Sequence, residues 1–212
     1  MTSAHDAVVL VAGGSRRLGQ PKQLLTREGE TLVRRGVRLA METAPRRLLV
    51  IVGGHAVAVS AAVRDLPADI LFNPEWEEGL ASSLRLAAAT LASTRADSSS
   101  ACLLLACDQP ALEAAHLAAL REGFIVRGCA ATRHGEGRGV PAWVPAELLA
   151  QASSLRGDRG LRGLLAARAD EHIALLDAPE LARDIDTPDD LREARQRGWI
   201  DPVPDAMPDP SP

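Results

Sequence analysis

Short apolar runs alternate along this chain with longer segments whose apolar residues recur at the helical period. The runs are rich in Val, Ile and Leu and predict β-strands at Ala7–Val11, Leu48–Val52, Ile70–Phe72, Cys102–Cys107, Gly128–Thr132, Ala142–Val144 and His172–Leu176. The periodic segments predict helices at Thr31–Glu42, His55–Arg64, Ala81–Ser93, Leu112–Gly123, Ala146–Ala152, Gly160–Ala169 and Pro188–Arg197. Strands that alternate with helices are typical of a mostly parallel sheet, because parallel neighbours need a long crossover between them. We therefore expect an α/β fold of three layers, with a Rossmann-like sheet covered by helices on both faces.

Glycine and proline mark where these elements end. Asp186-Thr187-Pro188 offers a helix cap followed by proline at the first helical position. Arg133–Gly139, rich in glycine and charge, and Asp201–Pro212, with five prolines, are expected to be irregular. Ser93–Ser100 is expected to be a helix-to-strand loop. Because no repeat or linker is visible, we expect one domain over residues 1–200 and a disordered tail over 201–212.

Length and composition are those of an ordinary globular domain. The chain has 212 residues, of which 46% are hydrophobic and 25% are charged. No apolar run approaches the roughly 20 residues that span a bilayer, and Met1–Asp6 is not leader-like, so we expect a cytoplasmic protein with no membrane part. The net charge of -4 and the aromatic content of 2% leave no basic field and few stacking platforms, which argues against a nucleic-acid partner.

Cysteine and histidine form no metal or disulfide pattern. Cys102, Cys107 and Cys129 lie in or beside apolar runs and are expected to be reduced core residues. The five histidines are scattered, which argues against a zinc site. Lysine is the informative cation, because Lys22 is the only lysine among 24 basic residues. A compact ammonium in a chain that otherwise uses arginine suggests a chemical role for that position.

The segment Val8–Lys22, VVLVAGGSRRLGQPK, is a buried strand that runs into a glycine-rich loop. Glycines let backbone amides approach phosphate oxygens, because no Cβ stands in the way. A Walker loop needs Lys and then Ser or Thr after its last glycine, but Gln20 and Pro21 follow Gly19. The dinucleotide spacing G-x-G-x-x-G is not met either. The loop therefore belongs to another class of phosphate loop or is an ordinary strand-to-helix turn.

The same loop resembles the LAAGxSxRMGxxK signature of the MobA-like nucleotidyltransferases, matched here as LVAGGSRRLGQPK from Leu10 to Lys22. The positions in register are Gly13, Ser15, Arg17, Gly19 and Lys22, with Leu18 in place of the usual Met and Val11 in place of the first Ala. The resemblance implies the fold of the nucleotide-diphospho-sugar transferases and a triphosphate bound in this loop.

Two further segments carry the resemblance into the nucleotide and metal sites. NPEWEEGLASS is similar to the family's NPxxxxGxxxS element, which implies nucleotide contacts at Gly79 and Ser83. LLLACDQP places Asp108 just past a buried strand, where open α/β sheets bind ligands and where the family has its magnesium aspartate. Taken alone, Asp108 before Gln109 and Pro110 could instead cap the next helix.

The second half of the chain resembles the family as well, so that the likeness runs from Val8 to Leu191. GRGVPAW is similar to an element near the acceptor site, with Val140 where His is usual. LRGDRGLRGLL and DIDTPDDL also match. The second of these implies a further magnesium ligand, for which Asp186 is the first choice and Asp184 the second, although both could belong to a helix-capping cluster.

The resemblance implies a molybdenum cofactor cytidylyltransferase, which transfers CMP from CTP to the terminal phosphate of molybdopterin and releases pyrophosphate with Mg²⁺. Ala12 before Gly13 follows the cytidylyl A-A-G pattern, whereas a shifted register would make Ala12-Gly13-Gly14 mimic the guanylyl A-G-G. The implied roles are backbone amides of Gly13–Ser15 for the β- and γ-phosphates, Arg17 for charge neutralisation and Lys22 for the charge on the α-phosphate and leaving group. Arg17, Lys22 and Asp108 are therefore the candidate catalytic residues.

Other functions remain open on the sequence alone. The same fold could transfer a nucleotide from GTP, or act on a sugar phosphate or polyol phosphate. A protein of another class, a non-catalytic maturation factor that carries cofactor to a molybdenum hydroxylase, would also bind molybdopterin. The presence of both Lys22 and Asp108 favours an enzyme, because a carrier needs neither.

Overall fold

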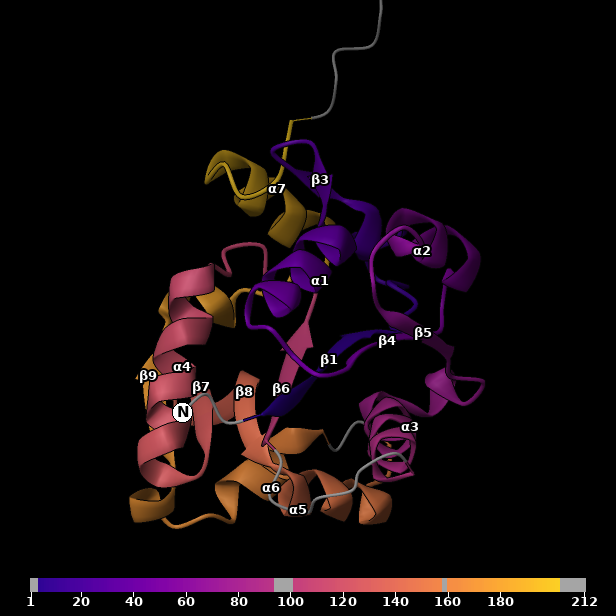
Figure 1. Ribbon diagram of the computed structural model, residues 1–212. Helices are drawn as coiled ribbons and strands as arrows, with labels where there is room; N and C mark the ends of the chain where they lie inside the picture. Colours follow the sequence, from indigo (N-terminus) through magenta and orange to yellow (C-terminus); the bar gives the residue numbers. More distant parts are fainter. Residues whose placement is uncertain (1–3, 94–100, 158–159, 203–212) are drawn as a thin grey trace, which may run out of the picture.

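The computed structural model describes residues 4–93, 101–157 and 160–202 and contains a seven-stranded sheet of order β5-β4-β1-β6-β8-β7-β9 (Figure 1). Its strands are β1 (His5–Val11), β4 (Leu48–Val52), β5 (Asp69–Phe72), β6 (Ala101–Ala106), β7 (Ala130–His134), β8 (Gly137–Pro145) and β9 (Ala174–Asp177). A small second sheet pairs β2 (Thr26–Arg27) with β3 (Glu30–Thr31). The α/β fold with a mostly parallel sheet is confirmed, because only β8 runs antiparallel to its neighbours.

Helices connect the strands. The α-helices are α1 (Leu32–Glu42), α2 (Ala56–Val63), α3 (Leu80–Ala92), α4 (Ala114–Arg127), α5 (Ala146–Ala150), α6 (Leu161–Ala166) and α7 (Pro188–Gln196). Short 3₁₀-helices are η1 (Lys22–Leu24), η2 (Trp76–Glu78), η3 (Gln151–Ser154), η4 (Asp170–His172) and η5 (Pro179–Ala182). Each predicted strand and helix has a counterpart within a few residues, which is the usual accuracy of element ends.

The sheet is buried between two apolar layers. Successive strand residues point to opposite faces, so Ala7, Val9 and Val11 join one core cluster and Val8 and Leu10 join the other. The first cluster packs under α1, α2 and α4, and the second packs under α3, α5 and α6. Figure 1 shows these helices on the two sides of the sheet. Burial on both faces explains why the central strands read as continuous apolar runs.

The strand order reverses direction at β1. From β1 the chain adds β4 and β5 on one side and then returns to place β6 on the other side. β1, β4, β5 and β6 are parallel, so their carboxyl ends lie at the same edge of the sheet. A crevice opens where consecutive connections leave in opposite directions, and open α/β sheets bind their ligands there. The segments that follow β1 and β6 contain the glycine loop and Asp108.

One local prediction is wrong. Residues 133–139 are not irregular but form the tip of a β-hairpin, in which β7 continues to His134 and β8 begins at Gly137. Gly135 takes a φ of 58° at the turn, a conformation that glycine adopts without strain. Of the charged residues that suggested a loop, Arg133 and Arg138 lie on the paired strands and Glu136 lies in the turn between them.

The C-terminal helix packs on the glycine loop. Leu18, Leu25 and Leu32 form a small core cluster with Leu191 and Ile200. The predicted cap of α7 is confirmed: the Thr187 side chain accepts from the Asp190 amide, and the Asp190 carboxylate accepts from the Thr187 amide in return. This third, smaller cluster therefore ties the C-terminal segment to the loop after β1.

The domain boundary at residue 200 stays a prediction. Asp201, which the prediction assigned to the tail, donates its amide to the Thr26 carbonyl and accepts from the amides of Glu28 and Gly29. The rest of the predicted tail from residue 203 onward lies outside the described residues, as does most of the predicted loop at 93–100.

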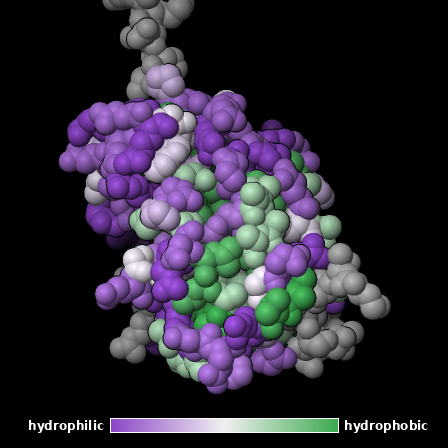
Figure 2. Space-filling model, turned by 90° about the vertical axis from the view of Figure 1, so that its left-hand side faces the viewer, coloured by the Kyte–Doolittle hydropathy of each residue, from purple (hydrophilic) through white to green (hydrophobic). Residues whose placement is uncertain are grey.

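Apolar side chains also reach the surface on the side of the molecule that carries α4 and β9, where Figure 2 shows a green patch framed by polar residues. Ile125 and Val126 of α4 are 55% and 75% exposed.

Among the helices that the structure describes, none has the length and apolar character required to cross a bilayer.

Candidate active site

A cavity of about 530 Å³ opens at the carboxyl ends of β1 and β6, the point where the strand order reverses. It is lined on one wall by Ala12, Gly13 and Lys22 from the glycine loop and on another by Asp108. Gly79 and Ser83 close a third side. The cavity therefore brings together eight of the residues singled out by the sequence: Ala12, Gly13, Lys22, Gly79, Ser83, Asp108, Val140 and Asp184.

The glycine loop is held in shape by a buried amide. Gln23, which is 1% exposed, donates from Nε2 to the carbonyl of Val11 at 3.1 Å and to that of Gly13 at 2.5 Å. Its Oε1 accepts from the Ser15 hydroxyl at 3.3 Å, and the same hydroxyl accepts from the Lys22 amide at 3.1 Å. The Ser15 side chain therefore closes the loop on itself, while its backbone adopts a φ of 50°.

The back of the loop packs against two glycines and a tryptophan. A Cβ built on Gly14 would lie 2.7 Å from the Trp76 ring, and one on Gly54 would lie 2.7 Å from the Gly14 Cα. The Gly54 amide also donates to the Ala12 carbonyl at 2.9 Å. By contrast, nothing lies within 4 Å of a Cβ built on Gly13. Gly14 is thus needed for packing, whereas Gly13 leaves open space beside the cavity.

Lys22 lies between two aspartates. Its Nζ is 2.7 Å from Asp108 Oδ2 and 2.8 Å from Asp186 Oδ1, and its side chain is only 12% exposed. Burial alone would lower the pKa of Lys22, but the charges and hydrogen bonds of Asp108 and Asp186 outweigh that effect and raise it. The ammonium is therefore permanently charged and joins the loop after β1 to the loop after β6.

The two candidate metal ligands near the C-terminus differ in ionisation. Partial burial would raise the pKa of Asp186, yet the hydrogen bond and charge of Lys22 lower it overall. For Asp184, desolvation within the concave site and the charge of Asp108 raise the pKa to about 7. Asp186 is thus an anion at neutral pH, whereas Asp184 holds its proton to a higher pH than an ordinary carboxyl group does.

Arg17 and Asp186 lie beside the cavity rather than in its lining. Arg17 is 71% exposed and its Nη2 is 2.8 Å from Asp186 Oδ2. Both line a neighbouring hollow of about 470 Å³ together with Trp199. The Ile185 amide donates to the Asp108 carbonyl at 3.2 Å and fixes the spacing between the two aspartate loops. Gly19, with a φ of 75°, turns the chain next to Arg17.

The asparagine that begins the NPEWEEGLASS segment organises the third wall. Asn73 is 3% exposed and donates from Nδ2 to the hydroxyls of Ser82 and Ser83 at 2.8 and 3.0 Å. Gly79 begins α3 with a φ of 108°, a value that favours glycine. The Ser83 hydroxyl therefore has a protein partner already, although its side chain lines the cavity.

The opposite end of the cavity is formed by β8 and α6. Val140 lines it, and its carbonyl accepts from His134 Nε2 at 2.7 Å and from Gln109 Nε2 at 3.0 Å. Arg162 of α6 also lines the cavity and adds positive charge there. An imidazole is thus present beside the position where the family usually has His, but it comes from residue 134.

Several residues of the site were not predicted from the sequence. Trp76 and Arg162 lie within two of the segments that resemble the family, but only the folded chain shows that they line the cavity. Gln23 could have been singled out, because it follows the only lysine and precedes an apolar pair. Gly53 and Gly54 directly follow β4, and a glycine pair after a buried strand is a signal of close backbone approach.

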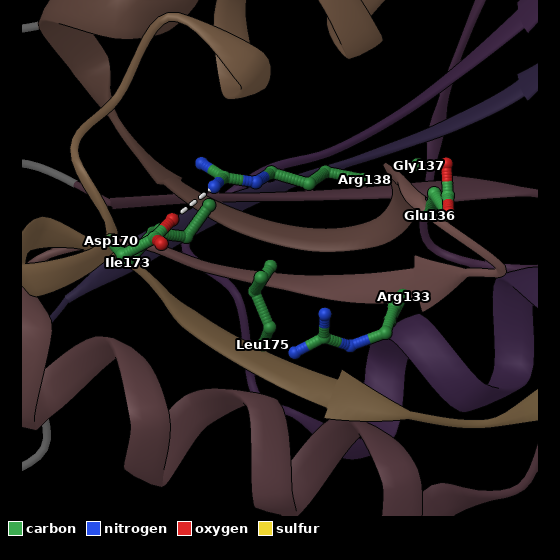
Figure 3. A pocket seen from close by; sticks show the side chains of 7 residues that line it. All are labelled: Arg133, Glu136, Gly137, Arg138, Asp170, Ile173 and Leu175. Atoms are coloured by element: carbon green, nitrogen blue, oxygen red, sulfur yellow. Dashed lines mark hydrogen bonds and ion pairs between the residues drawn. The ribbon is translucent and has the colours of Figure 1, made fainter.

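A separate hollow of about 320 Å³ lies at the far edge of the sheet, where β7, β8 and β9 meet (Figure 3). Arg138 and Asp170 pair there, as the dashed line shows, and Leu175 of β9 forms part of its floor. None of its described lining residues is a predicted site residue. The cavity at β1 and β6 is therefore the better candidate for the active site.

Loss of the Gln23 amide is expected to destabilise the loop measurably. In Gln23→Leu the Val11 and Gly13 carbonyls lose their donor, which should lower the free energy of unfolding by about 1–3 kcal/mol. Urea unfolding should show a lower midpoint with an unchanged slope. The matched control is Gln20→Leu, because Gln20 is exposed on the same loop. Equal midpoints for the two variants would contradict the structural role of Gln23.

Comparison with known proteins identifies the family of the chain. A sequence model described as the MobA-like NTP transferase domain matches residues 7–173. The "Probable molybdenum cofactor guanylyltransferase" of Opitutus terrae is 33% identical over 168 residues, which is 78% of this chain and 79% of that protein. The "Molybdenum cofactor cytidylyltransferase" of Escherichia coli K12 is 27% identical over 197 residues, which is 92% of this chain and 97% of that protein.

Solved structures show the same fold. Rv0371c of Mycobacterium tuberculosis H37Rv is 29% identical, with a TM-score of 0.75 over 92% of this chain and 99% of that one. A 4-diphosphocytidyl-2C-methyl-D-erythritol synthase has a TM-score of 0.66 at 17% identity, over 92% and 98% of the two chains, which shows the fold alone. With the matched model covering most of its length, the chain belongs to the MobA-like NTP transferase family and is an enzyme of the nucleotidyltransferase class.

Proposed function

We propose that the enzyme transfers CMP from CTP to the terminal phosphate of a molybdopterin-type cofactor and releases pyrophosphate. The observation that carries the proposal is the contact of Lys22 with Asp108 at the point where the strand order reverses, next to a glycine loop. The names of both curated relatives described above include the words molybdenum cofactor. Three buried free cysteines fit a reducing compartment, so we place the reaction in the cytoplasm.

The residues present fit a magnesium ion. Asp108 Oδ2 and Asp186 Oδ1 already approach one positive centre, the Lys22 nitrogen, at 2.7 and 2.8 Å. No three His, Cys, Asp or Glu side chains form a ready-made metal site within residues 4–93, 101–157 and 160–202. Mg²⁺ commonly binds through one or two carboxylates and completes its shell with phosphate oxygens and water. We therefore propose Asp108 and Asp186 as its protein ligands.

The chemistry requires positioning and charge neutralisation. An acceptor phosphate oxygen is already ionised, so it attacks the α-phosphorus without a general base, the new P–O bond forms, and the bond to the β-phosphate breaks. Backbone amides beside Gly13 hold the leaving pyrophosphate, and Lys22 neutralises charge that grows on the bridging oxygen. Bound Mg²⁺ would supply Lewis-acid stabilisation of the phosphates. On this assignment the acceptor would bind on the side of the cavity that Val140 and Arg162 line.

The base preference can be measured directly. Ala12 precedes Gly13 as in the cytidylyl pattern, and we expect pyrophosphate release with CTP to exceed that with GTP, ATP and UTP in the presence of molybdopterin-type acceptor. Preference for CTP by about tenfold or more would correspond to 1.4 kcal/mol or more of differential binding to the transition state. A clear preference for GTP would overturn this interpretation of Ala12 and favour the function named for the Opitutus terrae relative.

The acceptor is tested in the same assay. Turnover with a sugar phosphate or polyol phosphate in place of molybdopterin would replace the proposed acceptor. Binding of CTP and cofactor without any pyrophosphate release would instead indicate a carrier that delivers cofactor to a molybdenum hydroxylase.

A further inference from the structure

The ammonium of Lys22 occupies the place that the proposed metal requires. Its Nζ is the shared hydrogen-bond donor of Asp108 Oδ2 at 2.7 Å and Asp186 Oδ1 at 2.8 Å. These two oxygens are also the atoms that would ligate Mg²⁺ in the proposed function. With side-chain exposures of 12% for Lys22 and 20% for Asp108, solvent does little to screen this contact.

Ammonium and metal exclude one another at this position. Carboxylate oxygens lie about 2.7–2.9 Å from an ammonium nitrogen and about 2.0–2.1 Å from Mg²⁺. A metal ion bound to both oxygens would compete with the ammonium for the same acceptor atoms, and two cations held by one pair of carboxylates would repel strongly. One of them must leave.

We propose that Lys22 is an internal counter-ion that holds Asp108 and Asp186 together in the free enzyme, and that the divalent cation arriving with the nucleotide displaces its ammonium onto the triphosphate. The inference rests on the proposed function only in taking these two aspartates as metal ligands. It makes the position of the catalytic ammonium depend on the presence of the metal.

The surroundings of Lys22 allow this movement. Its backbone amide is fixed by the Ser15 hydroxyl at 3.1 Å, so only the four-carbon stem has to turn. The side chain lines the cavity beside Gly13, where nothing lies within 4 Å of an added Cβ. The ammonium can therefore reach the space assigned to the triphosphate while the main chain stays in place.

Arg17 behaves differently from Lys22. It contacts the other carboxylate oxygen of Asp186, Oδ2, at 2.8 Å, from the exposed side. After Lys22 is displaced, Arg17 therefore still contacts Asp186 and holds the orientation of its carboxylate. Arg17 positions the metal ligand, whereas Lys22 moves away to make room for the metal.

Metal affinity of the nucleotide-free protein tests the inference. Binding of Mn²⁺, followed by the loss of its free EPR signal, is expected to be on the order of ten- to a hundredfold tighter in Lys22→Met than in the wild type, within the usual range of coupling between two linked ligands. Lys22→Gln should show the same change and serves as the second variant. Arg183→Met removes one exposed positive charge that pairs with Glu193, and should change the affinity by less than about twofold.

The double variant Lys22→Met/Asp108→Asn should lose the gain, which places the ion at the aspartates. Equal or weaker Mn²⁺ binding in both Lys22 variants would overturn the inference, whether or not the enzyme turns over CTP. Tighter Mn²⁺ binding by Lys22→Met, together with a wild-type enzyme that releases no pyrophosphate from any nucleotide, would uphold the counter-ion and reject the proposed function. The two failures are therefore distinguishable.

Discussion

Asp108→Asn is expected to lower the rate of pyrophosphate release by roughly two to four orders of magnitude, in the range seen when a charge-stabilising group is lost from a preorganised site. The substitution keeps the shape of the side chain but removes its charge. Asn therefore can neither ligate the metal strongly nor hold the Lys22 ammonium, which lies 2.7 Å away in the wild type. Initial rates with CTP, Mg²⁺ and acceptor would measure the effect.

The fold should survive this change. Asp108 follows β6 at the rim of the cavity. Its backbone carbonyl accepts a hydrogen bond from the Ile185 amide, and this bond does not depend on the Asp108 side chain. Circular dichroism and thermal unfolding would check this. Asp189→Asn is the matched control, because Asp189 is 82% exposed on α7 and lies outside the cavity lining. Full activity in Asp108→Asn would remove the metal and the ammonium from the proposed mechanism.

The sheet and its two faces could be predicted from sequence because the relevant forces are local or periodic. Burial of β1 appears as a continuous apolar run, since both faces of a central parallel strand are covered. The hairpin at residues 133–139 could not be predicted in the same way. Its charged residues look like a loop, and only the turn at Gly135 and pairing with β8 reveal the strand.

Several residues that line the cavity could be predicted from the sequence, but most of their contacts could not. The glycine loop and Asp108 follow different strands, and the principle that parallel strands end at one edge places them together. The contacts of Lys22 span 86 and 164 residues of sequence, so no local pattern specifies them. Trp76 against Gly14 is likewise a packing contact between distant segments. Geometry of this kind follows from tertiary packing.

Lys22→Met is expected to lower turnover by a similar factor, roughly two to four orders of magnitude, but for a different reason. The methionine stem fills the same space without a charge, so the growing negative charge on the leaving group loses its partner. Unlike Asp108→Asn, this variant keeps both carboxylates and should still bind the metal and the nucleotide. Presteady-state measurements should therefore find the chemical step slowed in a protein that still binds the nucleotide.

A different cation at position 22 distinguishes the effect of the charge from the effect of the side-chain shape. Lys22→Arg retains the charge, but a planar guanidinium cannot turn between the aspartates and the triphosphate on the same short path, so only partial activity is expected. If Lys22→Met retained wild-type turnover, the ammonium would serve only to hold Asp108 and Asp186 in the free protein. The other outcome is that Lys22→Met loses activity and also binds Mn²⁺ more tightly. Those two results together would show that the Lys22 ammonium pairs with Asp108 and Asp186 in the free enzyme and with the triphosphate during the reaction, because the metal needs the same two carboxylates.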